Sequence, residues 1–572
     1  MNHSLSAINI GNFKAFAGVQ HIPFKPITLI FGPNSSGKSS IIHSLAFAHD
    51  AQLGQEKLDF SRLDIHHTDI GGRSIDLGGF RQYIHQRIYD KKMEWGAELA
   101  VNMLGGNIAA LLSSLKTISI SISIGINADS GDLKVGDEPR VESIDINGDG
   151  VELLHMSRRR SLFDYSKDNV FRIDRLKTEH QVFQQIIKAI VETATTTESI
   201  SLEDIEVLCE SIDNLLPDLL VGVEKFFPTS VVVQKEDDSE PLQSDMLFPV
   251  SKGNRKEDLS KVVHSYFPRI LNDLFNGISN TLTNELSRFQ YLGPLRSFPP
   301  RHLSFSEHGD VNWNAGGGFA WDVIRNDTQV RNAVNKWLGS DKLKTPYLLN
   351  IKSFFALDAL DVPLENGLGY IQDLKEQKSS EMESENSFND INLEDLEDIG
   401  FKKETLIEEI AESDIDRIRE LVLFDKRTKT EVSHRDVGIG ISQVLPVLVM
   451  AYGSKGKIIA MEQPEIHLHP ALQAELGDVF IESALGEYKN TFILETHSEH
   501  LILRLLRRIR ETSEGELPEG CTPMRPEDVC VIYVQPGNEG STAIEIKVTP
   551  DGDFETPWPD GFFAERAKEL FG

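Results

Sequence analysis

Short apolar segments and longer helical periodicities alternate along the chain. Near the N-terminus, apolar residues predict strands at residues 7–10, 12–16 and 27–31. A glycine-rich turn follows the last of these, and the pattern beyond it predicts a helix from Ser39 to about His49. The N-terminal region is therefore predicted to contain two strands, followed by a third strand, a glycine-rich turn and a helix.

The middle of the chain changes from a strand pattern to a helix pattern. Isoleucines alternate with serines at residues 117–126, and the Asn-Gly-Asp-Gly sequence at 147–150 is typical of a tight hairpin, so we expect an antiparallel sheet. At residues 180–227 and 256–289 the apolar spacing is closer to helical and predicts a compact helical insert. Neither segment is long or heptad-regular enough for an extended coiled-coil arm.

These patterns predict an α/β fold class with an antiparallel β-subdomain and a helical insertion. The predicted regions are residues 1–175, with the first strands and the β-subdomain; 176–288, the helical insertion; 289–430, a connecting region; and 431–572, where apolar strands and helices return. Within the third region, residues 372–413 carry 14 Asp or Glu against 4 Lys, a composition that suits a disordered or solvated insert.

Charge, cysteine content and hydropathy narrow the class of protein. The formal net charge of -31 argues against wrapping nucleic acid over the whole surface, because phosphate neutralisation needs clustered Lys and Arg. The arginines at 158–160 and at 504–510 could contact nucleic acid locally, could be solvated, or could pair with a partner protein. Three cysteines give no disulfide framework, and without a long apolar run or a leader we expect a soluble, cytoplasmic protein with no membrane partner.

The strand, turn and helix near the N-terminus carry a phosphate-loop motif. Its residues are Gly32, Pro33, Asn34, Ser35, Ser36, Gly37, Lys38 and Ser39, followed by Ser40. Backbone N–H groups of such a loop cradle phosphates, because they and the helix N-terminus carry partial positive charge. Lys38 would reach the β- and γ-phosphate oxygens, and Ser39 would hold magnesium. The motif therefore predicts ATP and Mg²⁺ as cofactors.

A second candidate element lies more than 400 residues later. The apolar strand at residues 457–461 ends in Glu462, which is followed by Gln463 and, two residues further on, by Glu465. A carboxylate at the end of an apolar strand is the Walker B arrangement, in which Glu462 would bind magnesium through water. Alone this pattern is common, so its weight comes from its combination with the phosphate loop.

Two further segments fit the same site. Gly440, Ser442 and Gln443 stand at a predicted helix start, and a glycine-flanked Ser there can donate to a γ-phosphate. His497 follows another apolar strand and can touch the same group. Singly, these residues also fit an ordinary helix-start turn and a structural histidine. The order and spacing of all the elements together favour a nucleotide site.

Several other residues are of types that bind metal ions, but the sequence around them does not complete a metal-binding motif. Residues 145–150 open like a calcium loop but lack the glutamate at position twelve, so a hairpin is favoured. His467, His469 and His500 lie near the elements above, but no cysteine or helical HExxH motif accompanies them, so zinc is not predicted. Gln290 is a candidate metal-sensing glutamine by its position alone.

Together these motifs resemble the ATPase heads of the SMC, RecF and overcoming-lysogenization-defect (OLD) group. The N-terminal segments at residues 12–16 and 31–34 carry the resemblance at one end of the chain. The segments at 291–296 (Tyr-Leu-Gly-Pro-Leu-Arg) and 558–563 (Trp-Pro-Asp-Gly-Phe-Phe) look most like the phage-defence branch, including Septu-like and retron-linked ATPase subunits. The resemblance implies an ABC-type P-loop head and covers roughly 1–50, 289–301 and 430–572.

The resemblance also implies partners. In such heads two copies meet head to tail, so Lys38 of one copy and Ser442 of the other would bind one nucleotide. Several members of the defence branch act with a separate nuclease or toxin. OLD nucleases carry a C-terminal Toprim domain, but only 75 residues follow His497 and they show no clear acidic metal cluster, so a nuclease within this chain is not expected.

One departure from the family pattern concerns turnover. The usual pair at the Walker B strand is Asp-Glu, where the second acid polarises the attacking water, whereas this chain has Glu462 and Gln463. A glutamine orients water but cannot accept a proton, although Glu465 could substitute for the missing acid. Three hypotheses follow: an ATPase head dimer that controls an effector in anti-phage defence, an ATP-locked clamp with little turnover, and a DNA-repair ATPase.

Overall fold

The computed structural model describes most of the chain in two units. The described residues are 3–54, 63–126, 138–159, 170–194, 202–234, 255–296, 311–339, 342–355, 417–432 and 439–559. The first unit comprises Met1–Ser297, Gly309–Ala320 and Ile439–Gly572, and the second comprises Phe298–His308 and Trp321–Gly438. Among the described residues, no helix is both long and apolar enough to cross a membrane.

A nine-stranded antiparallel sheet forms one layer of the first unit, in the order β10-β9-β8-β7-β6-β5-β4-β1-β2. Its strands are β1 (Leu5–Gly11), β2 (Gln20–Pro23), β4 (Met93–Ala100), β5 (Thr117–Gly125), β6 (Arg140–Gly148), β7 (Val151–Arg158), β8 (Val170–Leu176), β9 (Leu219–Glu224) and β10 (Phe227–Val233). Strand β5 confirms the predicted alternation, because its isoleucines are buried. The predicted hairpin is confirmed too: Asp149 and Gly150, both with positive φ, join β6 to β7.

A second sheet of the same unit is mostly parallel and has the order β11-β15-β16-β3-β17-β18, with only β18 antiparallel to its neighbour. Its strands are β3 (Ile27–Phe31), β11 (Phe289–Leu292), β15 (Ile458–Glu462), β16 (Thr491–Glu495), β17 (Val529–Gln535) and β18 (Thr542–Ile546). Every residue of β3 and β15 is buried, as expected for parallel strands covered on both faces. Strands from both ends of the chain therefore form one sheet.

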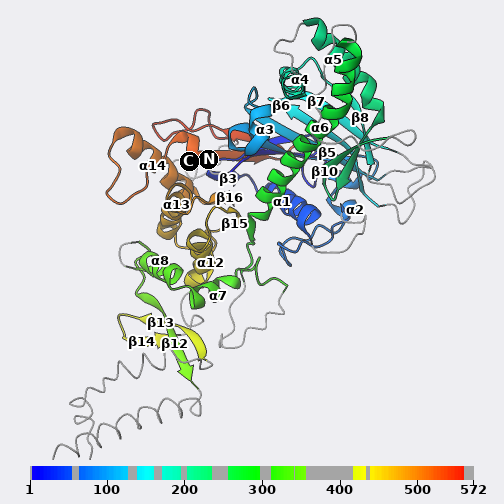
Figure 1. Ribbon diagram of the computed structural model, residues 1–572. Coiled ribbons are helices and arrows are strands. Elements are labelled where there is room, and N and C mark those ends of the chain that lie inside the picture. Colours follow the sequence, from blue (N-terminus) through cyan, green and yellow to red (C-terminus); the bar gives the residue numbers. More distant parts are fainter. Residues whose placement is uncertain are drawn as a thin grey trace, which may run out of the picture. The chain divides into compact units, whose positions relative to one another are not determined.

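Helices cover this parallel sheet. Helix α1 (Lys38–Leu53) packs against β11 and β16, and α13 (Pro470–Leu485) packs against β16 and β3. Helices α12 (Ile439–Gly453) and α14 (Glu499–Glu514) pack against α13, and Figure 1 shows these three helices on the side of the strands away from α1. The strand, phosphate-loop turn and helix predicted at the N-terminus are thus β3, the turn after it, and α1.

Three further helices belong to the first unit. α4 (Gln181–Ala194) and α5 (Leu202–Leu215) lie in the chain between β8 and β9, and α6 (Arg255–Ser287) connects β10 of the antiparallel sheet to β11 of the parallel sheet. Helix α6 packs against β10, α5, α4 and α1, whereas α2 (Phe80–Tyr83) and α3 (Gly106–Leu111) are short. The helical prediction for 180–227 is wrong after residue 218, because β9 and β10 begin there. The residues of β9 alternate between buried and less buried, as in a strand with one covered face. The strand has only six residues, so this two-residue period does not stand out in the sequence.

The predicted strand at residues 12–16 is also wrong, because these residues form a tight turn. Asn12 and Lys14 have positive φ angles of 49° and 46°, and Phe13 and Phe16 bridge to each other. This conformation buries both phenylalanine side chains completely. The apolar pattern therefore arises from the turn's two core contacts and not from a strand.

The second unit contains a three-stranded antiparallel sheet in the order β12-β13-β14. Its described elements are α7 (Phe319–Asn326, which begins in the first unit), α8 (Thr328–Leu338), β12 (Tyr347–Phe355), β13 (Arg417–Asp425) and β14 (Thr430–Val432). Asp327 caps α8, because its Oδ1 accepts from the backbone N–H groups of Gln329 and Val330. The predicted acidic insert at 372–413 lies outside the described residues.

Candidate active site

The phosphate loop is packed so closely that two of its positions require glycine. A Cβ atom on Gly32 would lie 2.5 Å from the carbonyl oxygen of Val534, and one on Gly37 would lie 2.2 Å from Cβ of Ala15. Both glycines also have positive φ, of 147° and 98°. The loop is thus held between the end of β17 and the turn at residues 12–16.

The remaining loop residues divide into exposed and anchored positions. Asn34 and Ser35 are exposed, whereas Ser36 and Ser40 are buried. The carbonyl oxygen of Ser36 accepts a hydrogen bond of 2.6 Å from Oγ of Ser541. Phe31, at the end of β3, packs edge-on against Trp558 of the C-terminal motif. The loop's base is therefore fixed by residues far along the chain, while its tip faces outward.

The ammonium group of Lys38 is bound by its own loop in this structure. Its Nζ donates to the carbonyl oxygens of Gly32 (3.1 Å) and Pro33 (2.9 Å) and lies 4.0 Å from Oε1 of Glu495. Ser39 Oγ donates to Oε2 of the same carboxylate at 2.7 Å. Glu495 is therefore the acid nearest to both phosphate-loop side chains.

Sequence reasoning did not assign a role to Glu495. The signal was present, because the apolar strand β16 ends in this carboxylate just as β15 ends in Glu462. In the sheet the two glutamates are register partners, and Glu495 also pairs with Ile30 on β3. Burial, and after it the charge of Glu462, raise the pKa of Glu495 to about 7. Two carboxylates thus flank the phosphate loop.

Glu462 is held by a chain of polar side chains. Its Oε1 accepts from Tyr291 Oη at 2.9 Å and lies 3.2 Å from Nε2 of His43. Nδ1 of His43 lies 2.6 Å from Nζ of Lys14, whose pKa burial lowers to about 8. When Lys14 donates to Nδ1, the neutral imidazole carries its proton on Nε2 and donates it to Glu462. The sequence analysis predicted Glu462 but neither His43 nor Lys14 as its neighbours.

The residues after Glu462 form a tight turn against the end of β16. Gln463 has a positive φ of 48°, and its N–H donates to the carbonyl oxygen of Glu495 at 2.7 Å. Glu465 is buried, and its Oε1 accepts from the backbone N–H of His497 at 2.8 Å. Burial raises the pKa of Glu465. Burial, and then the charge of Lys38, lower the pKa of the half-buried His497, which is consistent with a neutral imidazole beside the loop.

Arg296 links this turn to the start of helix α12. Its Nη1 donates to the carbonyl oxygen of Gln443 at 2.6 Å, and its Nη2 donates to that of Gln463 at 3.0 Å. Burial lowers the pKa of this guanidinium to about 10. Arg296 and Tyr291 both belong to the segment at 291–296 noted in the sequence, so that segment positions two predicted site elements at once.

The predicted helix-start residues lie in the first turn of α12. Ser442 and Gln443 are buried in the chain, and a Cβ on Gly440 would lie 2.9 Å from the carbonyl oxygen of His467. Within the described residues, this turn is thus packed against the segment that follows β15. The structure brings Glu462 and His497 near Lys38 of the phosphate loop, Glu465 to His497, and Gln443 to Arg296.

Other predicted candidates lie elsewhere. The amide oxygen of Gln290 accepts from Ser454 Oγ at 2.9 Å, while the next residue, Tyr291, is the one that contacts Glu462. His469 Nδ1 accepts from the N–H of Ala471 and caps α13. Among the described residues, no group of three His, Cys, Asp or Glu is arranged to hold a metal ion.

The oxygen donors beside the loop nevertheless fit Mg²⁺. This ion is bound in nucleotide sites through one or two carboxylates together with waters and phosphate oxygens, not by a full protein cage. Ser39 Oγ and a carboxylate oxygen of Glu495 are 2.7 Å apart, and Glu462 ends the adjacent strand. The three side chains supply hard oxygen ligands only.

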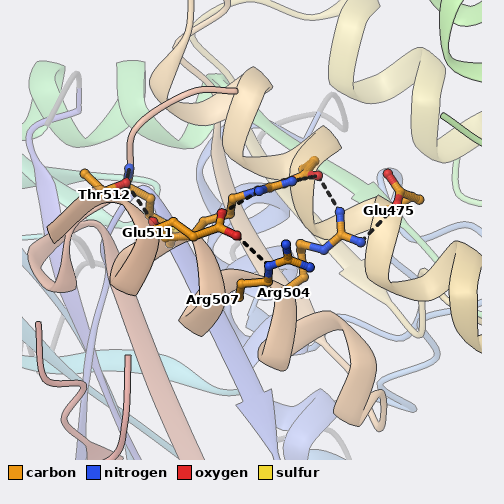
Figure 2. A network of polar contacts seen from close by, with 8 residues as sticks. Glu475, Arg504, Arg507, Glu511 and Thr512 are labelled. Atoms are coloured by element: carbon orange, nitrogen blue, oxygen red, sulfur yellow. Dashed lines mark hydrogen bonds and ion pairs between the residues drawn. The ribbon is translucent and has the colours of Figure 1, made fainter. Parts of the chain in front are cut away.

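The candidate nucleic-acid arginines mostly contact the chain itself. Arg504 donates to Asp478 (2.5 Å) and to Glu475 (2.9 Å, Figure 2), and Arg508 donates to Asp478 and Glu511. In the other cluster, Arg158 donates to the carbonyl oxygen of Val141, Arg159 donates to Gln234, and Arg160 lies outside the described residues. Arg504 and Arg508 therefore form structural ion pairs, whereas Arg507 and Arg510 are the exposed arginines of α14 and Arg507 pairs with Glu511.

Two stretches of the chain are similar to known ATPase families. Residues 7–261 match the family described as AAA domain, and residues 339–502 match the family described as AAA ATPase domain. These matches and the phosphate loop in its strand-turn-helix setting support an AAA-type ATPase with the α/β P-loop fold that the sequence predicts. No curated protein matches the chain.

Solved structures with SMC heads are also similar to the chain. One is an SMC head bound to the C-terminal winged-helix domain of ScpA, with 9% identity, 95% of this chain and 98% of that chain covered, and a TM-score of 0.33. A second is an SMC head domain with an extended coiled coil, bound to the C-terminal domain of ScpA derived from Pyrococcus furiosus. Its identity is 10%, 99% of this chain and 98% of that chain are covered, and the TM-score is 0.32. A third is the SMC head domain from Thermotoga maritima, with 9% identity, 95% of this chain and 99% of that chain covered, and a TM-score of 0.30.

Proposed function

We propose that the chain binds Mg-ATP at the phosphate loop and hydrolyses it to ADP and phosphate. The observation that carries the proposal is the convergence of Lys38 and Ser39, from one end of the chain, with Glu462, Glu495 and His497 from the other. Two of these contacts, from Ser39 and Lys38 to Glu495, are within 4.0 Å. Phosphoryl transfer needs this combination of a cation, a hydroxyl, carboxylates and backbone donors around one group.

Each side chain has a role that its position supports. Lys38 exchanges the carbonyl oxygens of its own loop for β- and γ-phosphate oxygens. Ser39 and Glu462 hold Mg²⁺, which neutralises charge on the phosphates when it is bound. His43 and Tyr291 orient Glu462. The neutral His497 donates a hydrogen bond to the γ-phosphate, and the backbone N–H groups of the loop bind the other phosphate oxygens.

Turnover at this site is proposed to be slow. Gln463 can orient a water molecule but cannot take its proton. Glu465 is an acid, but its Oε1 accepts from the N–H of His497 and its side chain is buried, so it acts first to position the His497 segment. This geometry favours the second candidate function, an ATP-locked clamp in which nucleotide holds two heads together for longer than in a fast ATPase.

The assembly that we propose is a head-to-tail dimer that controls a separate effector, a nuclease or toxin in anti-phage defence. Gly440, Ser442 and Gln443 of one copy then face the nucleotide bound by Lys38 of the other. The dimer and the effector are supported by the resemblance to the phage-defence branch at residues 291–296 and 558–563. A DNA-repair ATPase is the alternative of the same family, and it predicts DNA-stimulated turnover that falls steeply with salt.

Phosphate release from Mg-ATP by the purified chain tests the proposal, with Lys38→Ala as the blank and Gln463→Glu beside it. We expect slow turnover that Lys38→Ala abolishes and Gln463→Glu increases by roughly 10-fold or more, as general-base catalysis allows. No turnover in the wild type with a gain in Gln463→Glu supports the clamp. No turnover and no ATP binding in any variant contradicts the proposed function.

A further inference from the structure

The second carboxylate beside the phosphate loop, Glu495, belongs to the oxygen donors that fit Mg²⁺, but no separate role has been assigned to it so far. Its side chain is only 8% exposed, and its two oxygens are used by Ser39 at 2.7 Å and Lys38 at 4.0 Å. These are the two side chains that the proposed function assigns to the metal and the phosphates. Glu495 thus binds, in the nucleotide-free chain, the groups that nucleotide binding must take over.

Glu495 and Glu462 differ in the polar neighbours that each carboxylate keeps once Lys38 has moved to the phosphates. Glu462 keeps Tyr291 and His43, with Lys14 behind them. Glu495 loses the one cation within 4.0 Å of it among the described residues. A buried carboxylate without a compensating cation is strongly unfavourable, and it also repels the triphosphate through a medium of low dielectric constant.

A divalent cation removes this penalty. An ion held near Ser39 lies within reach of Glu495, because the hydroxyl and the carboxylate already contact each other. Ser39 and Glu495 would hold such an ion, and its charge would take the place of the Lys38 charge beside the Glu495 carboxylate.

We propose that Glu495 makes this site select the magnesium complex of the nucleotide over the free nucleotide. The inference rests on the proposed function, since it concerns the same site. It assigns Glu495 as a specificity-determining residue: its negative charge disfavours metal-free nucleotide and favours the nucleotide that arrives with Mg²⁺. Metal and nucleotide then bind with positive coupling, and removing the charge reduces that coupling.

The test is equilibrium binding of a fluorescent ATP analogue at pH 8.0, in excess Mg²⁺ and in excess EDTA. For the wild type we expect affinity in Mg²⁺ to exceed that in EDTA by roughly 100-fold, within the usual range of such couplings. For Glu495→Gln we expect about 10-fold, with tighter binding in EDTA than the wild type shows. Glu545→Gln, which makes the same charge change at exposed β18, is the matched control and should keep the wild-type ratio.

The possible results separate the two proposals. Equal Mg²⁺ ratios for the wild type and Glu495→Gln, or no gain of binding in EDTA, overturn the role of Glu495 while leaving the nucleotide site intact. No binding by the wild type in Mg²⁺ contradicts the proposed function itself. Should Glu495→Gln not fold, Glu495→Asp keeps the charge, and it must retain a ratio well above 10-fold for the inference to stand.

Discussion

At the residue scale, Glu462 depends on neighbours from three separate parts of the chain. Tyr291 lies in β11 next to β15, His43 lies on α1, and Lys14 lies in the turn that also covers Gly37. Donors that orient a metal-binding carboxylate are worth about 10- to 100-fold in metal affinity or activity in other proteins. The position of this carboxylate is therefore set by contacts that no local motif contains.

Removing the Tyr291 hydroxyl should loosen Glu462 without changing its charge. We expect Tyr291→Phe to raise the Mg²⁺ concentration needed for half-maximal phosphate release by about 10-fold, with a smaller effect at saturating Mg²⁺. Phosphate release as a function of Mg²⁺ concentration measures both quantities. Tyr89→Phe, outside the site, is the control. An unchanged Mg²⁺ requirement in Tyr291→Phe would show that the 2.9 Å hydrogen bond has no functional weight.

The titration of Glu495 should appear in the stability of the nucleotide-free chain. Its pKa is about 7 in the fold and 4.5 ordinarily, so the folded state binds the proton more tightly than the unfolded state does. The resulting stabilisation is complete below the ordinary pKa and disappears as pH rises through about 7. Over pH 5.5 to 8 the wild type should therefore lose about 2 kcal/mol that Glu495→Gln does not lose.

Paired thermal melts of the two proteins, without metal or nucleotide, measure this difference. The subtraction removes the contributions of titrating groups that do not interact with Glu495, because both proteins contain them. The melting temperature of Glu495→Gln relative to the wild type should rise with pH. A constant difference across the range would mean that Glu495 titrates near its ordinary value.

At the element scale, helices α13 and α14 are joined by buried ion pairs. Asp478 accepts from both Arg504 and Arg508, and Figure 2 shows Arg504 reaching Glu475 while Arg507 reaches Glu511. The Asp478 and Arg508 side chains are 10% and 8% exposed. Without Asp478, Arg504 keeps only Glu475 and Arg508 keeps only Glu511, so two largely buried guanidinium groups lose part of their charge compensation.

Asp478→Ala should therefore destabilise the first unit by about 3 kcal/mol, since two arginines lose their shared acceptor. Chemical unfolding followed by circular dichroism measures the change. Arg510→Ala, at an exposed arginine of the same helix, should change stability by less than about 0.5 kcal/mol. A stability loss in Asp478→Ala no larger than in Arg510→Ala would contradict the structural role of these ion pairs.

Much of the element pattern could be predicted from sequence, and the errors have a common cause. β3, α1, β5 and the hairpin at Asp149 were predictable because strong local periodicity or turn chemistry specifies them. Residues 12–16 and 219–227 were not, because their apolar side chains are buried by contacts with distant segments. In such short runs the tertiary contacts decide the conformation, and the local pattern does not.

In the candidate site, too, the residues of a local motif could be predicted from sequence, whereas residues brought together by tertiary contacts could not. The phosphate loop is one continuous motif, so its residues could be read directly from the sequence. Glu495 and His43 contact the loop or Glu462 only because the sheet order places β16 between β15 and β3. That order is a property of the whole sheet. An apolar strand ending in a carboxylate was visible twice, but one sequence does not say that the two strands are neighbours.

At the scale of the whole molecule, the proposed dimer makes each nucleotide site depend on both copies. Lys38 would come from one head and Ser442 from its partner, so either single variant damages both sites of its own dimer. In a mixed dimer of Lys38→Ala and Ser442→Ala, the two changes fall in the same site. The other site then keeps an intact Lys38 and an intact Ser442.

Mixing the two inactive variants should therefore restore turnover. With random pairing, half of the dimers are mixed and each has one intact site out of two. The mixture should therefore show about a quarter of the activity of the protein that carries neither change. Phosphate release in the Gln463→Glu background, where turnover is expected to be higher, measures the recovery. Mixing Lys38→Ala with the double variant Lys38→Ala, Ser442→Ala is the control, because no intact site can form. Without recovery in the first mixture, Lys38 and Ser442 serve the same copy's nucleotide or do not share one, and the head-to-tail dimer is wrong.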